Sequence, residues 1–327
     1  MVTSVGLNAP AACAAIRAGI DNMAETRFMD SGGKWIVGSS VPLDPPWRGR
    51  AKMVHLVVPA IRECLNAVRG IPTEQIPLML CVAEKDRPGR LEGLDDKLFY
   101  EVTTELDLSF HERSMVIAGG RVGGVWAIRK AQELLYQERV SCCLVAGVDT
   151  YLVSGTLREY VANNRILTDK NSDGFIPGEA GSAILIGKVG SAVGKRMTIL
   201  GIGFGTEKAT ILTEEPLRAD GLVKAIKQAL AKSGLNIANI DYRITDNNGE
   251  QYGFKEASLA LTRILRVRKA EFDVWHPVDC IGEVGAAIVP CVISVAMAAM
   301  QKDYAPGNKG IFHFSNDDGQ RAAIVFS

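Results

Sequence analysis

Apolar and polar residues follow two different periods along this chain of 327 residues. Short apolar runs, typical of buried strands, are separated by segments whose apolar residues recur at three and four positions, the spacing of one helix face. In the first part of the chain the expected strands are 3–7, 35–38, 76–81, 114–118, 141–147 and 182–187. The expected helices between them include 51–68, 94–106 and 122–136. Strands that alternate with helices predict parallel sheets covered by helices.

A second set of elements follows a Gly/Ser/Lys-rich segment, 188–195, which we interpret as a linker. Its expected strands are 197–204, 240–245, 271–275, 310–314 and 321–326, and its expected helices are 221–232, 254–265 and 283–300. The order of elements repeats that of the first set, although no residue-level repeat is visible. We therefore predict two similar halves, 1–190 and 191–327, each a mixed sheet with helices on both faces.

One doubly wound sheet is the alternative to two halves. The run Gly201-Ile-Gly-Phe-Gly205 does not support a nucleotide site in such a sheet. It lacks the third-glycine spacing and the acidic partner that dinucleotide binding requires.

The composition excludes several classes of function. The 37 Lys and Arg balance 37 Asp and Glu, so no excess charge favours nucleic acid or an anionic membrane. The N-terminal residues lack the pattern of a signal peptide, and the longest apolar stretch, 285–300, is shorter than the roughly 20 residues of a membrane span. Seven cysteines without C-x-x-C or His-rich spacing predict neither a metal site nor a disulfide framework. We expect a cytoplasmic protein with reduced cysteines and no cofactor.

Three segments carry a resemblance to a known family. The run Asp173-Gly-Phe-Ile-Pro-Gly-Glu-Ala-Gly-Ser-Ala-Ile-Leu-Ile-Gly187 resembles the D-G-F-x-x-G-E-G-A-G-x-x-x-L segment of β-ketoacyl-ACP synthases. Arg48-Gly-Arg-Ala-Lys-Met53 is similar to the G-R-x-x-R-M at the start of a long helix there, and the segment from Ala127 to Val148 is similar to the helix and strand after the family's nucleophile. The resemblance implies an α/β, thiolase-like fold: two pseudo-symmetric βαβαβαββ halves in a five-layered α-β-α-β-α sandwich.

The position of the family's nucleophile holds no thiol. In the family this cysteine begins a buried helix, whose dipole and free N–H groups lower the thiol pKa. Counting back from Ala146-Gly147-Val148 places Arg121 there, within Ala118-Gly-Gly-Arg-Val-Gly-Gly124. The glycines of this run also fit close packing where a strand meets a helix.

The family's histidines and lysine are replaced as well. The first histidine falls on Asn247 or Asn248, in an Asp-Asn-Asn-Gly run that equally predicts a turn. The second histidine falls on Glu283 and the lysine on Val278. Because both central positions face one small cavity in the family, we expect Arg121 and Glu283 to form an ion pair. The turn Ser315-Asn-Asp-Asp-Gly319 is acidic where the family is small and apolar, which should alter the wall of the acyl pocket.

The resemblance leaves two functions open. The first is a catalytically degenerate β-ketoacyl-synthase-like protein acting as an adaptor, chaperone or partner subunit. Its loop Asp246-Asn-Asn-Gly-Glu250 resembles a degenerate branch often encoded beside type VI secretion effector and loading genes, which implies a secretion effector or an acyl carrier protein as partner. The apolar strand near 114–120 also predicts a homodimer.

The second function is a 3-oxoacyl-ACP synthase-like acyltransferase with a rebuilt site. In that case Cys280 would be the nucleophile and Glu283 the base. A carboxylate raises the pKa of a neighbouring thiol, which argues against this pairing.

Overall fold

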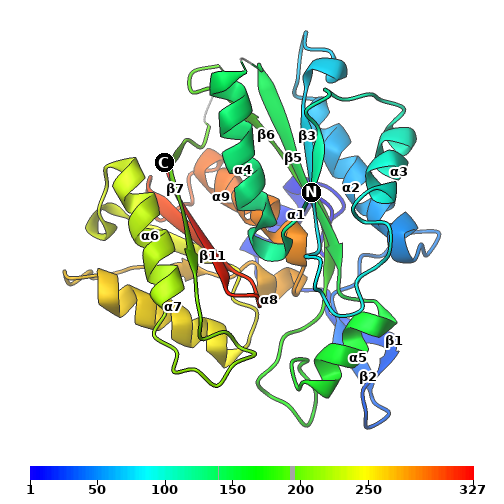
Figure 1. Cartoon of the computed structure of the whole chain (residues 1–327). Helices are drawn as coiled ribbons and strands as arrows, with labels where there is room; N and C mark the ends of the chain where they lie inside the picture. Colours follow the sequence, from blue (N-terminus) through cyan, green and yellow to red (C-terminus); the bar gives the residue numbers. More distant parts are fainter. Residues whose placement is uncertain (139, 192–195) are drawn as a thin grey trace.

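Two sheets lie face to face with helices between them and outside them (Figure 1). The computed structural model describes residues 1–138, 140–191 and 196–327. Helices α2 and α3 cover the outer face of the first sheet, α4 and α9 lie between the sheets, and α6 and α7 cover the second sheet (Figure 1). The five layers α-β-α-β-α confirm the predicted fold class.

The first sheet has the strand order β4-β3-β5-β6 and the second has the order β7-β11-β10-β8-β9. The strands of the first are β3 (Leu78–Val82), β4 (Met115–Ala118), β5 (Cys142–Thr150) and β6 (Glu179–Gly187). Those of the second are β7 (Ile199–Thr206), β8 (Tyr242–Thr245), β9 (Val274–Trp275), β10 (Gly310–Ser315) and β11 (Gln320–Phe326). The layer helices are α2 (Gly49–Leu65), α3 (Lys97–Leu106), α4 (Gly120–Gln137), α6 (Asp220–Ser233), α7 (Gln251–Ile264) and α9 (Ile288–Gln301). Smaller elements are α1 (Ala9–Arg17), β1 (Ala24–Met29), β2 (Trp35–Gly38), α5 (Ser154–Ala162) and α8 (Val278–Ile281).

The two sheets share one topology. In the first, β3 runs parallel to β4 and β5, and β6 is antiparallel to β5; in the second, β8 runs parallel to β9 and β10, and β11 is antiparallel to β10. Strand β7 pairs antiparallel with β11, and Val2 makes the corresponding antiparallel bridge to Gly181 of β6. The predicted repetition of order is therefore present in the sheets, while the boundary between 1–190 and 191–327 stays a prediction.

Close packing explains the Gly-x-Gly-x-Gly run of β7. A Cβ built on Gly201, Gly203 or Gly205 would lie 2.2, 2.0 and 2.0 Å from backbone oxygens of α6. Only glycine lets the helix lie this near the strand. The run is a helix-packing surface, in agreement with the absence of a complete nucleotide fingerprint.

Several expected elements differ from the structure. Residues 3–7 form a turn instead of a strand, because the N–H groups of Thr3 and Gly6 donate to each other's carbonyls. The expected strand 271–275 is only Val274–Trp275, and the expected helix 283–300 begins at Ile288, since Gly282 and Gly285 adopt positive φ of 70° and 50°. The proposed linker 188–195 lies partly outside the described residues. Among the described residues, no helix is long and apolar enough to cross a bilayer.

Candidate functional site

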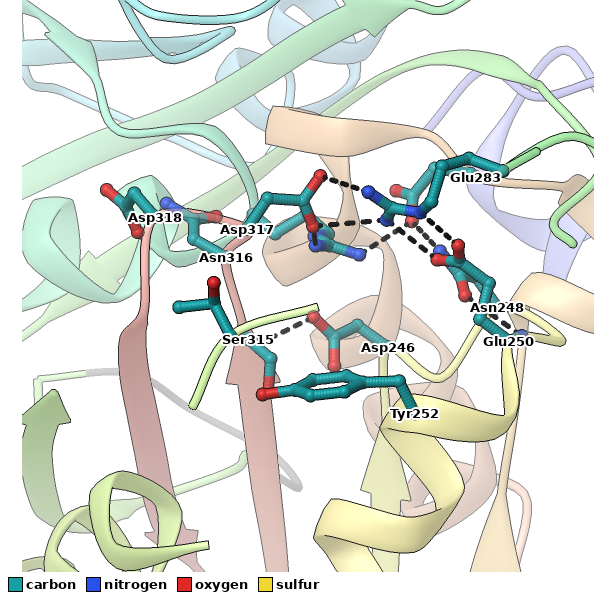
Figure 2. Close-up of polar contacts among 12 residues, drawn as sticks. Asp246, Asn248, Glu250, Tyr252, Glu283, Ser315, Asn316, Asp317 and Asp318 are labelled. Carbon is teal, nitrogen blue, oxygen red and sulfur yellow. Dashed lines mark hydrogen bonds and ion pairs between the residues drawn. The ribbon is translucent and has the colours of Figure 1, made fainter. Parts of the chain in front are cut away.

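Residues that the resemblance assigns to the family's catalytic positions come together in the structure (Figure 2). The Nη1 of Arg121, in the first turn of α4, lies 3.1 Å from Oε2 of Glu283. The side-chain amide of Asn248 donates to the same oxygen at 2.7 Å. The expected ion pair between Arg121 and Glu283 is therefore confirmed.

Two glycines allow these side chains to converge. Gly120 starts α4 with φ +52°, and a Cβ on it would lie 2.2 Å from Oε2 of Glu84. Gly285 has φ +50°, and its N–H donates to Oε1 of Glu283 at 2.9 Å. Glu283 thus lies before a short 3-10 turn, Gly285–Ala287, and not at the start of a long helix as the sequence suggested.

Two further groups extend the pair into a buried cluster. Asp317, in the β10–β11 turn, accepts from Nη2 of Arg121 at 2.6 Å and from Nη1 of Arg165 at 3.2 Å. Arg165 also binds Glu250 through two nitrogens, with Nη2 to Oε2 at 2.9 Å. Figure 2 shows Asp317 pointing toward Glu283 while Asp318 points away. We call Arg121, Arg165, Glu250, Glu283 and Asp317 the ion-pair cluster.

The ion-pair cluster links residues from early and late parts of the chain. Both arginines precede the predicted boundary at 190, and all three carboxylates follow it. The side chain of Glu283 is 1% exposed and that of Arg165 is 8% exposed. Arg165 was not among the predicted site residues, because it lies in a loop after α5 with no local pattern that marks it.

The electrostatics fix the charges of this cluster. Burial disfavours the charged form of Arg121 and so lowers its pKa. The charges of Glu283 and Asp317 outweigh that effect and hold the pKa well above the usual value. Burial alone would raise the pKa of Asp317, yet Arg121 and Arg165 lower it below the usual value. Both groups stay ionised at neutral pH, so neither exchanges protons as a catalytic acid or base must.

Little space remains beside the cluster. A hollow of about 30 Å³ is lined by Asp246, Asn247, Asn248 and Tyr252, together with members of the cluster. That volume holds about one water molecule. Asn247 and Asn248 are thus brought beside the ion-pair cluster, at a hollow too small for an acyl chain.

Cys280 does not join the site. Cys280 belongs to α8, and its Sγ lies 3.9 Å from the carbonyl oxygen of Ile16 in α1. Burial first, and then Asp279, raise the pKa of its thiol. Burial likewise raises the pKa of Cys81, Cys143 and Cys291 to about 12. Thiols in such surroundings are poor nucleophiles. Among the described residues, no three His, Cys, Asp or Glu side chains are placed to hold a metal ion.

Asp246 is a titratable group at the edge of the hollow. Its Oδ2 accepts the N–H of Ser315 at 2.8 Å, and burial raises its pKa from 3.8 to about 7. Because the unfolded chain releases this proton at lower pH than the folded chain does, Asp246 reduces the stability of the fold progressively as pH rises from 3.8 to about 7.

Asp246→Asn keeps an acceptor for Ser315 and removes the charge. We expect the variant to gain free energy of unfolding relative to the parent as pH rises, on the order of a few kcal/mol above pH 7. Urea unfolding at a series of pH values measures the difference, with Asp318→Asn in the exposed turn as control. A difference that stays constant with pH would contradict the prediction.

Structural comparison places this arrangement in a known fold. No protein-family model matches the sequence, and none of the curated proteins does. A chain of a type II polyketide synthase ketosynthase in complex with its acyl-carrier protein aligns with a TM-score of 0.82 at 13% identity, covering 99% of this chain and 96% of that one. A ketosynthase in complex with its chain length factor from Xenorhabdus doucetiae aligns with a TM-score of 0.72 at 14% identity. The alignment covers 100% of this chain and 95% of that one.

A β-ketoacyl synthase from Burkholderia phymatum also aligns over nearly the whole chain. The TM-score is 0.72 at 14% identity, and the alignment covers 99% of this chain and 96% of that one. Identities this low establish the fold and not the activity. The expected resemblance is confirmed at that level: the chain has the thiolase-like fold of the β-ketoacyl synthases.

Proposed function

We propose that this protein is a non-catalytic, ketosynthase-like partner subunit or adaptor. The observation that carries the proposal is that Arg121, which motif spacing assigns to the position of the family's nucleophile, forms ion pairs with Glu283 and Asp317. A guanidinium cannot accept an acyl chain. The small hollow of about 30 Å³ beside these ion pairs also supports the proposal.

The remaining polar groups do not replace the lost chemistry. Acyl transfer needs a nucleophile and donors aimed at the developing oxyanion. The side-chain amide of Asn248 is already used by Glu283, and Asn247 only lines the hollow. An amide cannot exchange a proton at neutral pH. A rebuilt acyltransferase that uses Cys280 gains no support from the position of that thiol beside α1.

The proposed partner is another protein, met in the cytoplasm. Structural relatives are complexes with an acyl-carrier protein or with a chain length factor, so this fold is used for protein association as well as for catalysis. For this chain we propose an acyl carrier protein or a type VI secretion effector as the partner class. The scaffold would contribute a rigid surface rather than a reaction.

The purified protein is expected to form no acyl adduct with acyl-carrier thioesters and no product from malonyl thioesters. General acid-base groups alone contribute about 10² to 10⁴ in rate, and the nucleophile is also missing. Intact-protein mass spectrometry after brief exposure is the measurement, with an active ketosynthase of this fold as positive control. A covalent acyl group on any cysteine would overturn the proposal, and Cys280→Ala should change nothing.

A homodimer is expected through β4. This strand is at the edge of the first sheet, and all its residues are partly exposed. An apolar edge strand with free backbone groups is usually covered in native proteins. Light scattering at micromolar concentration should give about twice the 35.2 kDa mass of one chain. A monomer mass under those conditions would refute the dimer and leave the non-catalytic role untouched.

A further inference from the structure

A groove lies along the free edge of β7, away from the ion-pair cluster. Its volume is about 450 Å³. Ile199–Ile202 of β7 form one wall, and α6 supplies Lys232. The side chains from α4 are Arg129, Gln132, Glu133, Tyr136 and Gln137. The groove therefore has a strand edge along its length and helices of two different layers on its sides.

The backbone of β7 is available along this groove. Strand β7 is the last strand of its sheet, and within the described chain it pairs only with β11. The N–H of Phe204 donates to the side chain of Gln228 at 2.7 Å instead of to β11, so it points out of the sheet. Hydrogen-bonding direction alternates along an antiparallel strand, so Ile202 also directs its N–H and C=O outward. Such an edge can accept an added strand.

The charges of the groove favour an anionic occupant. Two cations, Arg129 and Lys232, and one carboxylate, Glu133, line the groove. Lys232 has no carboxylate partner in the part of the chain that the structure describes, and Glu133 lies 3.7 Å from Arg129 but 3.2 Å from Lys130, outside the groove lining. Burial, and then the charge of Arg129, lower the pKa of Lys232, so the two cations disfavour each other. A carboxylate between them would relieve this repulsion. Tyr136, 56% exposed, offers apolar surface beside them.

We propose that this β7 groove binds an extended, acidic segment of a protein partner, which adds to the second sheet as a strand beside β7. The segment's backbone pairs with Ile202. Its alternate side chains point to opposite faces, so carboxylates reach Lys232 or Arg129 while apolar residues contact Tyr136. The inference rests on the proposed role as a partner-binding body and names one surface for it.

The test uses labelled ten-residue peptides as probes. The first alternates valine with glutamate, the second has lysine in place of glutamate, and the third carries N-methyl groups on alternate backbone amides of the first. Fluorescence anisotropy should show that the full-length protein binds the first peptide and neither of the others. Hydrogen exchange should slow in the segment 199–204 when the first peptide is bound.

A pair of matched variants locates the binding. Arg129→Glu with Lys232→Glu should raise the Kd of the first peptide at least about tenfold, which is about 1.4 kcal/mol of binding free energy. Lys224→Glu with Lys227→Glu, on the exposed side of α6, should leave binding unchanged. Circular dichroism checks that both variants are folded.

Three results of the binding measurements would overturn the inference: no binding of the first peptide at about 1 mM, equal binding of all three peptides, or equal weakening by both double variants. Conversion of a dimer to monomers by Arg129→Glu with Lys232→Glu would show that a second copy covers the groove, and would also overturn it. None of these results bears on whether the protein becomes acylated, so the proposed function is tested separately.

Discussion

Arg121→Met is expected to lower the free energy of unfolding by about 3 to 5 kcal/mol, the usual cost of removing one member of a buried ion pair. The change leaves Glu283, 1% exposed, with donors from Asn248 and Gly285 but no cation. It also removes one of the two arginines that bind Asp317. Urea unfolding of the variant and the parent gives the difference.

A control on the same helix distinguishes the loss of a buried ion pair from the loss of an arginine charge in general. Arg129→Met removes an arginine whose side chain is 41% exposed and lies 3.7 Å from Glu133, and such surface pairs contribute about 0 to 1 kcal/mol. Adding Glu283→Leu to Arg121→Met should recover part of the loss, because no unpaired glutamate then stays buried. Equal costs for Arg121→Met and Arg129→Met would show that the cluster does not stabilise the fold.

Gly285→Ala is expected to be comparably damaging, for a steric reason. The residue has φ +50°, and its Cβ would lie 2.0 Å from Oδ2 of Asp149. That carboxylate cannot move aside easily, because Arg87 and the N–H of Ala286 bind it at 3.2 and 3.0 Å. Left-handed strain costs about 1 to 2 kcal/mol and overpacking about 1 to 3 kcal/mol more.

Gly234→Ala isolates the backbone part of that cost. Gly234 follows α6 with φ +70° and nothing within 4 Å of a Cβ, so only the strain of about 1 to 2 kcal/mol applies. Thermal and urea unfolding of the two variants give the comparison. If both substitutions lower the free energy of unfolding equally, the contact between the new Cβ and Asp149 adds no cost, and the steric argument for Gly285 is wrong.

The layers could be predicted from the sequence because buried strands and amphipathic helices have local periods. The strand β5 and helix α4, for example, lie close to the expected 141–147 and 122–136. The break before α9 could not be predicted this way. The run 284–293 is apolar throughout and gives no sign of a break. The positive φ of Gly282 and Gly285 depends on contacts with segments far along the chain.

The site was predictable only in part for a related reason. The positions of Arg121, Asn248 and Glu283 followed from motif spacing, and the structure brings these three together. Asp317 belongs to a turn whose acidity was visible, yet nothing local shows that it faces Arg121 and Arg165 across 196 and 152 residues. Partners at such separations are set by topology, which only the folded chain reveals.

The arrangement of charges in the ion-pair cluster makes the two halves unequal despite their common topology. Expressed as separate fragments, the first would expose two arginines and the second three carboxylates at the surface that they share. Each fragment would carry unpaired charges of one sign at that surface, where water instead of the opposite charges would solvate them. Mixed together, they should reassemble, and the reassembly should weaken as salt screens the approach of the opposite charges.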